Sequence, residues 1–380
     1  MTYIHQLTDW PVFEWAQDLL GDKLARVRHR QGRLLGRFES LGGSLPAQAQ
    51  LRSLTDEAVR SSRIDGHDLD EDQVRSALSN RLSPDSHGPN HGAGAGTGAR
   101  AGAEDTEGAK GAAGVLLDST EHFDEPLTED RLYGWHRSLF PADKNDLAKK
   151  QVGCWRNDRS GPMRVMAGPK GRERIQFQAP SAKLIDGEIQ SFLEWFNGDY
   201  ELDGVLKAGV AHLWFVTIHP FTRGNGRIAR TITDLTLARS ENTSKRFYSL
   251  SAQMLEERDH YYGILEATQK GRLDITDWLV WFLDCLDRAF ERAEASAADL
   301  LTKGKFWQVH AGKEFNERQI HILDSLLNET DRRITSSEWA KLGGCSQDTA
   351  SRDINDLLGR GVLARGEAGG RSTGYFLGEL

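Results

Sequence analysis

Cysteine is scarce in this 380-residue chain, and long apolar runs are missing from it. The cysteines are too far apart to have metal-ligand spacing, and their odd number does not suit a disulfide framework. They are Cys154, Cys285 and Cys345. The longest apolar stretch, near residues 205–218, is interrupted by Lys207 and His212, and no basic stretch precedes an apolar core at the start of the chain. The sequence therefore predicts neither a signal peptide nor a membrane span, and its thiols suit a reducing cytoplasm.

A strong charge of either sign is also lacking. The formal net charge is −8, which gives no whole-chain argument for binding nucleic acid or a membrane surface. Hydrophobic residues make up 38% of the chain, enough for a sizeable core. At this length we expect a protein of two or three domains.

The most informative segment runs from His219 to Arg230 and reads His-Pro-Phe-Thr-Arg-Gly-Asn-Gly-Arg-Ile-Ala-Arg. Apolar residues recur at helical spacing on both sides of it, so the segment predicts a turn between two helices. Gly224, Asn225 and Gly226 open the second helix, where free N–H groups and the positive end of the helix dipole attract anions. Glycine also lets an anion approach the backbone closely.

Three arginines follow one stripe at the start of that second helix. Arg223, Arg227 and Arg230 are spaced at i, i+4 and i+7, which places them on one face. Cations at a helix N-terminus are disfavoured by about 0.3 to 1 kcal/mol each. A bound polyanion would remove that cost, so the segment predicts a phosphate site with His219 beside it as a base.

This segment resembles the signature of the Fic family, His-Pro-Phe-x-(Asp/Glu)-Gly-Asn-Gly-Arg-x-x-Arg, and matches eight of its nine fixed positions in order. Members of that family mostly transfer AMP from ATP to a protein hydroxyl. The resemblance implies a mainly α fold, in which a helical core carries a β-hairpin flap. It also implies that His219 deprotonates a target Ser, Thr or Tyr, and that ATP is the substrate. Asn225 and the neighbouring amides would hold its α-phosphate, and Arg227 and Arg230 its outer phosphates.

Arg223 departs from the family pattern, because it occupies the place of the carboxylate that ligates Mg²⁺. A guanidinium has no acceptor atom and stays protonated, so it is no metal ligand, and we expect no metal held by the protein at this position. A carboxylate plus Mg²⁺ carries about the same net charge as one arginine, so Arg223 could neutralise the phosphates directly. The alternative is a site that binds nucleotide but transfers poorly. The sequence leaves the use of Mg²⁺ open.

An inhibitory motif is predicted at Ser61, Asp65 and Gly66. The spacing Ser-x-x-x-Asp-Gly resembles the family's inhibitory motif (Ser/Thr)-x-x-x-Glu-(Gly/Asn), with an acid one methylene shorter. In the family this acid pairs with the second arginine of the signature, which here is Arg230. A plain helix end with an Asp-Gly turn has the same sequence. Contact between Asp65 and Arg230 would make the resting enzyme self-inhibited.

A β-hairpin is predicted ahead of the signature. Two short runs, 163–166 and 174–177, flank a Gly- and Pro-containing loop. In the Fic family a hairpin at this place takes the target as an added strand and leaves its hydroxyl over the histidine. The flap residues would be Met163, Arg164, Val165, Ile175 and Phe177.

The rest of the chain divides by composition. Residues 1–83 predict an N-terminal helical region resembling the extension of a subgroup of Fic proteins, with Asp9-Trp10-Pro11 as a helix start. Residues 84–114 become Gly, Ala and scattered His, which predicts a flexible linker. Residues 115–305 would form the Fic-type core. Residues 313–380 predict a separate C-terminal domain.

This last domain has the pattern of a winged helix-turn-helix, with three predicted helices followed by two short strands around a glycine-rich loop. In such a fold the segment 346–375 would meet DNA through the third helix and the wing. The candidate contact residues are Gln347, Thr349, Ser351, Arg352, Asn355, Arg365 and Arg371. Acids slightly outnumber bases in this domain, so a protein-docking or regulatory use is an equal alternative.

Three functions are consistent with these motifs. The first is a protein adenylyltransferase, supported by the signature, the inhibitory motif and the flap together. The second is a nucleotide-binding or DNA-binding regulator with little catalysis, supported by Arg223 and the winged helix. The third is a Fic-type transferase that uses another phosphate-containing donor. The sequence names no target protein and leaves self-association open, and it predicts no membrane partner.

Overall fold

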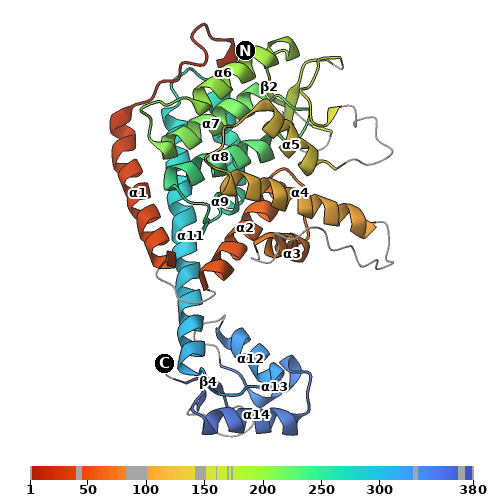
Figure 1. Cartoon of the computed structure of the whole chain (residues 1–380), viewed down its shortest axis with the longest axis vertical. Helices are drawn as coiled ribbons and strands as arrows, with labels where there is room; N and C mark the ends of the chain where they lie inside the picture. The colour runs from red at the N-terminus through yellow and green to blue at the C-terminus, as the bar shows by residue number, and fades with distance from the viewer. Residues whose placement is uncertain are drawn as a thin grey trace. The chain divides into compact units, whose positions relative to one another are not determined.

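The computed structural model describes residues 2–39, 45–82, 101–141, 151–159, 161–168, 171–172, 174–327, 333–366 and 373–378. It is mainly helical, as predicted, and divides into two compact units (Figure 1). Unit 1 comprises Met1–Glu39 and Ala47–Ala293, and unit 2 comprises Ser40–Pro46 and Glu294–Leu380. None of the helices in the described segments combines the length and apolar character that crossing a bilayer requires.

Unit 1 begins with the short 3₁₀ helix η1 (Ile4–Gln6) and the helices α1 (Gln17–Glu39), α2 (Leu45–Ile64) and α3 (Glu71–Leu82). The predicted helix start at Asp9-Trp10-Pro11 is wrong, because these residues form a turn that contains a cis Trp10–Pro11 peptide. Tertiary contacts decide the local structure here. The Trp10 indole donates to Glu188 over 2.8 Å, and its ring packs edge-on against Trp214.

Helix α4 (Ala101–Glu121) corrects the predicted flexible linker at 84–114. Residues 84–100 of that linker lie outside the described residues, but from Ala101 onward the segment is helical and packs on α3, α5 and α8. Ala109 and Ala113 are fully buried. The small residues that predict flexibility in the sequence form instead a smooth helix surface that packs closely. A Cβ added at Gly111 would lie 1.9 Å from the Ser138 carbonyl oxygen, so α4 and α5 touch through a glycine.

The centre of unit 1 is the pair α7 (Gly204–Ile218) and α8 (Asn225–Glu241), which pack closely against each other (green in Figure 1). Helix α7 is mainly apolar, and each residue after Gly204 is buried except the partly buried Lys207, as expected for the middle of a core. Asp203 caps it by accepting the Val205 N–H at 2.8 Å. The other core helices are α5 (Glu129–Leu139), α6 (Ile185–Asn197), α9 (Leu250–Glu256), α10 (Arg258–Gln269) and α11 (Thr276–Val309). Units 1 and 2 divide within α11, upstream of the boundary predicted between 305 and 313.

The predicted β-hairpin is present. Strands β1 (Arg164–Ala167) and β2 (Arg174–Gln178) pair antiparallel, with Val165 opposite Phe177 and a register shift after Val165. A short 3₁₀ helix, η4 (Ala182–Leu184), follows and leads into α6.

Unit 2 contains α12 (Glu317–Leu327), α13 (Ser336–Leu342) and α14 (Gln347–Gly359), followed by the antiparallel strands β3 (Leu363–Arg365) and β4 (Tyr375–Leu377). Thr335 and Glu338 form a capping box at α13, and Ser346 caps α14 by accepting the Thr349 N–H. Trp339 is fully buried at the centre of this unit's own core. Its indole faces Asp353, whose carboxylate pairs with Arg318 at 2.6 Å.

The packing of α4 predicts opposite effects for two of its glycines. Gly111→Ala should lower the free energy of unfolding by about 1 to 3 kcal/mol, because the new methyl group overlaps the α5 backbone. Gly108→Ala is the matched control: its Cβ would lie an ordinary 3.6 Å from Leu69, so the gain in helix propensity, about 1 kcal/mol, should stabilise the protein. Chemical denaturation of the two variants measures both effects. Equal stabilisation by the two would mean that α4 does not pack on α5.

Candidate functional site

His219 ends helix α7 in a left-handed conformation, with φ 52°, and this turns its side chain toward a cleft. Its Nδ1 lies 3.2 Å from the Val216 carbonyl oxygen, which only accepts, so Nδ1 carries the proton and Nε2 is left with a lone pair. Burial, reinforced by the charge of Arg156, lowers the pKa of His219 to about 4. The imidazole is therefore neutral at neutral pH and able to accept a proton at Nε2.

The loop between α7 and α8 is closed by Asn225. Its side chain accepts the Phe221 N–H at 2.9 Å and donates to the Phe221 carbonyl at 2.8 Å. The Phe221 ring is fully buried, and Gly224 has a φ of 75° that lets the chain enter α8. These two bonds use Oδ1 and one of the two N–H donors of Nδ2. Asn225 also lines the cleft, and its contact with a phosphate stays a prediction.

No side chain caps the N-terminus of α8, and Gly224, Asn225 and Gly226 line the cleft there. The backbone at this helix start is thus open to an anion, as the glycines predicted. The three arginines of the stripe surround it in three different environments.

Arg230 is almost fully buried and already bonded. Its Nε donates to the Ser61 hydroxyl at 2.8 Å, and its Nη2 donates to the Ser61 carbonyl at 2.7 Å and to Asp65 Oδ2 at 3.0 Å. Gly66 comes next in the chain and has a φ of 81°, a left-handed conformation that forms the turn after α2. A Cβ on Gly226 would lie 2.9 Å from Asp65 Oδ1, so that glycine leaves room for the carboxylate.

Arg227 and Arg223 make fewer hydrogen bonds and ion pairs than Arg230 does among the described residues. Arg227 Nε lies 4.0 Å from Asp65 and has no hydrogen-bond partner, and burial lowers the pKa of this guanidinium to about 10. Arg223 is exposed, and its guanidinium packs 4.2 Å from the centre of the Phe140 ring. The Arg227 guanidinium lies 4.5 Å from the same ring. Among the residues that line the cleft, Asp65 is the one carboxylate.

The cleft itself encloses about 290 Å³. Helix α10 contributes Tyr261 and Tyr262 to its wall, and the hairpin contributes Val165 and Phe177. The remaining predicted flap residues lie off the cleft. Met163 packs against the cluster of Tyr3, Phe177 and Ala179, while Arg164 and Ile175 are exposed.

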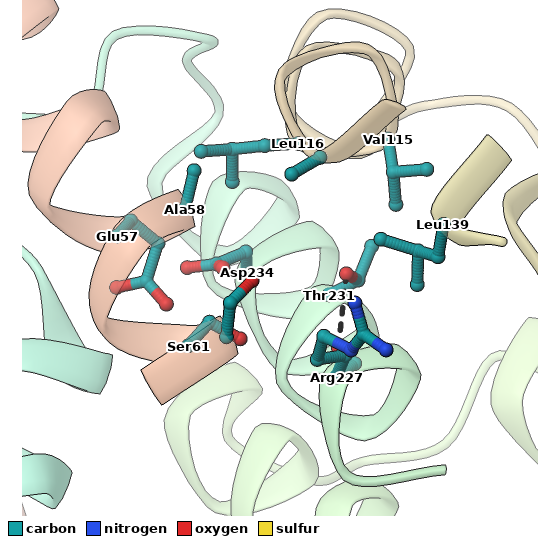
Figure 2. Close-up of a pocket in the computed structure, with 11 residues that line it drawn as sticks. Glu57, Ala58, Ser61, Val115, Leu116, Leu139, Arg227, Thr231 and Asp234 are labelled. Carbon is teal, nitrogen blue, oxygen red and sulfur yellow. Dashed lines mark hydrogen bonds between the residues drawn. The ribbon is translucent and has the colours of Figure 1, made fainter. Parts of the chain in front are cut away.

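A second, smaller cavity lies behind the arginines, where α2 meets α8 (Figure 2). Its volume of about 20 Å³ is enough for one water. Glu57 of α2 and Asp234 of α8 both reach this space, and burial together with the charge of Glu57 raises the pKa of Asp234. Asp234 pairs with Arg246 at 3.0 Å, and Glu57 accepts from Ser249 at 2.8 Å. The helix that precedes Asp65 and the helix that carries the arginines are thus both bonded to the segment 246–249.

Two residues that the sequence did not single out hold the loop. His136 is fully buried; its Nε2–H donates to the Arg223 carbonyl at 3.2 Å, and its Nδ1 accepts the Gly153 N–H at 2.9 Å. Its ring stacks on Phe221 with centroids 4.1 Å apart. Arg156 donates from Nε to the His219 carbonyl at 2.8 Å. Both come from segments far ahead of the signature, and neither has a spacing pattern that could have revealed it.

Two segments of the chain match the models of two different families. Residues 126–237 match the model of the Fic/DOC family, and residues 3–83 match a domain of unknown function, DUF4172. The curated relatives include the protein adenylyltransferase fic-1 of Caenorhabditis elegans, 30% identical over 100 residues, which are 26% of this chain and 18% of that protein. The protein adenylyltransferase Fic of Drosophila willistoni is 30% identical over 114 residues, 30% of this chain and 21% of that protein. The matched region thus spans about a fifth of these relatives.

Solved structures share the fold. A Fic family protein from Desulfovibrio desulfuricans G20 superposes with a TM-score of 0.56 at 16% identity, covering 96% of this chain and 97% of its own. A Fic domain containing signaling protein from Bacteroides thetaiotaomicron gives a TM-score of 0.52 at 18% identity, covering 72% of this chain and 98% of its own. The matched segment 126–237 contains the whole stretch from His219 to Arg230. Residues 126–237 of this chain therefore form a domain of the Fic/DOC family, and that domain contains the predicted signature.

Proposed function

We propose that this chain is a protein adenylyltransferase, which transfers AMP from ATP to a Ser, Thr or Tyr hydroxyl of a target protein. The observation that carries the proposal is that a neutral His219, with its Nε2 lone pair free, shares one cleft with the open N-terminus of α8 and with Arg223 and Arg227. The named relatives are protein adenylyltransferases, which supports the same reaction here.

In the proposed reaction His219 Nε2 takes the proton of the target hydroxyl. The hydroxyl oxygen forms a bond to the α-phosphorus of ATP, and the bond from that phosphorus to the bridging oxygen of the β-phosphate breaks. AMP is then on the target, and pyrophosphate leaves. The α8 N-terminus and the arginines stabilise the negative charge on the phosphates throughout.

We propose that the resting protein is self-inhibited. Arg230 directs two of its three nitrogens at Ser61 and Asp65, so it is not free to form a full fork with the terminal phosphate. Asp65 also puts a negative charge 4.0 Å from Arg227, on the side where outer phosphates would bind. Release of Asp65 would free both guanidinium groups for ATP.

Metal use is where this chain departs from its family. The cleft does not fit a protein-held Mg²⁺, because its one carboxylate is bonded to Arg230, and the described residues hold no cluster of three metal-ligating side chains. Arg223 lines the cleft, and no ion pair with it occurs among the described residues. We propose that Arg223 meets the phosphates directly and supplies the charge that a carboxylate with its ion supplies elsewhere.

The same residue favours the alternative of a nucleotide-binding regulator with little catalysis, because a guanidinium neutralises charge without polarising the phosphoryl group as a metal does. Another phosphate-containing donor is the remaining alternative. Arginines and a helix N-terminus recognise phosphates, and they do not determine which nucleobase the donor carries.

We propose that the hairpin docks the target as an added strand, with Met166 and Ile175 as apolar contacts. These two residues face each other across β1 and β2 and are 50% and 40% exposed. An extended target segment would place its hydroxyl over His219 by backbone hydrogen bonds.

For unit 2 a winged helix that binds DNA through 346–375 stays a proposal. Helix α14 exposes Ser351, Arg352 and Asn355, as that use requires, but Asp348 and Asp356 are exposed on the same helix. Gln347 donates to Ser337, and Thr349 is bonded to Ser346, so both are used within the unit. Arg365 is exposed, and Arg371 lies outside the described residues. Because DNA affinity comes largely from phosphate contacts, the acids favour a docking role, and self-association is equally untested.

Replacing His219 tests the base. In an Asp65→Gly background, His219→Ala should reduce transfer of label from ATP by about 10² to 10⁴. ATP binding, measured by calorimetry, should stay within a few fold, since other groups hold the phosphates. His260→Ala is the control, because His260 lies exposed on α10 outside the cleft. Full transfer by the His219 variant would remove this residue from the mechanism. In the active background the acid limb of the rate profile should lie near pH 4, since His219 accepts a proton only above its pKa of about 4.

Replacing Asp65 tests the inhibition. Asp65→Gly should raise self-modification at least about tenfold. Arg230 would then donate to a phosphate instead of to Asp65, and one such charge-assisted hydrogen bond is worth about 1.5 to 3 kcal/mol. Asp68→Gly is a matched control: it removes an acid three residues on, which pairs with Arg63 on the surface. An equal rate in the parent and the Asp65 variant would reduce the motif to a helix end.

Replacing Arg223 tests the charge substitution. Arg223→Asp should make ATP binding depend on Mg²⁺, because a carboxylate offers this hard cation an oxygen ligand. Arg223→Gln removes the same positive charge without adding that ligand, so it should weaken ATP binding and gain no Mg²⁺ dependence. Calorimetric titration with and without Mg²⁺ separates the three proteins. If the parent already binds ATP as tightly and with as much Mg²⁺ dependence as the aspartate variant, another group holds the metal.

A further inference from the structure

The first residues of the chain pack directly on the hairpin. The Tyr3 ring meets the Phe177 ring edge-on, with centroids 5.2 Å apart, and the His5 ring meets the same phenyl edge-on at 5.7 Å. Tyr3 and His5 stack on each other at 5.9 Å. Tyr3 is buried, and Val165 and Met163 pack against the same cluster.

A hydrogen bond adds direction to this packing. His5 Nε2 lies 2.9 Å from the carbonyl oxygen of Gln178, the last residue of β2. A carbonyl only accepts, so Nε2 carries the proton and donates. The Tyr3 N–H is bonded to the Gln6 side chain at 2.8 Å, which ties the two ends of η1 together. The segment is thus a small folded unit whose side chains pack against, and hydrogen-bond to, one end of the hairpin.

Phe177 connects the contact with Tyr3 to the proposed reaction site. It is 1% exposed, it lines the cleft that contains His219, and its register partner Val165 lines the cleft with it. The opposite support of the hairpin is α10, where Gln176 donates to the Tyr262 carbonyl at 3.1 Å and Arg174 pairs with Glu266 at 2.7 Å. Strand β2 therefore has one anchor on η1 and another on α10. Loss of the first would leave the strand free to move relative to His219.

We propose that Tyr3 and His5 are positioning residues for the hairpin, so that the domain of residues 3–83 places the target segment as well as carrying the inhibitory Asp65. This inference rests on the proposed transfer reaction. It assigns a role to a domain whose matched family has no known function. A displacement of about 1 Å between a nucleophile and the group that it attacks is enough to cost on the order of 10²-fold in rate, so the contact with Phe177 has a direct consequence for transfer.

Helix α10 links the two arms of this domain. The Ile64 carbonyl, next to Asp65, accepts from Arg258 at 2.9 Å and from Tyr262 at 3.3 Å. Tyr262 is also the residue whose carbonyl holds Gln176 of the hairpin. The end of the domain that carries Asp65 and strand β2 of the hairpin thus meet on one turn of α10.

Hairpin mobility tests the inference without any catalysis. Tyr3→Ala should make trypsin cut the hairpin after Arg172 or Arg174 at least about fivefold faster, and should increase hydrogen exchange in β1 and β2. Tyr3→Phe keeps the ring contact with Phe177 and should behave as the parent. The melting temperature of each variant, and its ATP affinity, should stay close to those of the parent, which excludes general unfolding.

Transfer tests the positioning itself. In the Asp65→Gly background, Tyr3→Ala should reduce self-modification with labelled ATP about tenfold or more, while the ATP concentration at half-maximal rate stays the same. Tyr3→Phe should restore the rate. Unchanged trypsin cleavage in Tyr3→Ala would overturn the inference, and so would a loosened hairpin with an unchanged transfer rate. If the Asp65→Gly protein transfers nothing at all, the proposed function fails, and the cleavage rates still decide whether Tyr3 holds the hairpin.

Discussion

Positive charge concentrated at the start of one helix is the constraint on which the rest of this structure depends. Arg223, Arg227 and Arg230 crowd the N-terminus of α8, where the helix dipole already disfavours cations, and the cleft supplies one carboxylate to balance them. Burying a guanidinium is costly unless it is paired and hydrogen-bonded. Arg230, the most buried of the three, meets that condition through Ser61 and Asp65, which lie 169 and 165 residues away in sequence. In the proposed self-inhibition, the bonds that stabilise the buried Arg230 are the same bonds that keep it from a ligand.

This constraint explains why the N-terminal domain is packed so closely on the core. Helix α2 brings Asp65 to α8. Below that contact Glu57 of α2 accepts from Ser249, and Asp234 of α8 pairs with Arg246, so both helices are tied to the segment 246–249. Helix α10 receives the carbonyl of Ile64 and supports the hairpin through Gln176. Under the proposed function, nucleotide access and target placement would depend on the same domain, so a change that loosens residues 3–83 should affect both.

The candidate site residues could be found in the sequence because they lie close together along the chain. The segment from His219 to Arg230 contains the proposed base, the glycines and the arginines in twelve consecutive positions, and the hairpin and the capped helices of unit 2 follow from short-range patterns. The supports could not be predicted, because they are set by tertiary contacts. His136 and Arg156 reach the loop carbonyls from distant segments, and the amide of Asn225 serves the loop itself. Helix α4 was mistaken for a linker because glycine and alanine allow both flexibility and close helix packing.

The central claim is that Asp65 and the terminal phosphate of ATP compete for Arg230. The most direct measurement is the affinity of the parent and of Asp65→Gly for ATP and for ADP, by calorimetry under one set of conditions. If the claim is right, the parent binds ATP and ADP about equally well, because the terminal phosphate finds Arg230 occupied. The Asp65→Gly protein should then prefer ATP by about tenfold or more, the equivalent of about 1.4 kcal/mol from one charge-assisted contact. The same ratio of ATP to ADP affinity in both proteins would contradict it.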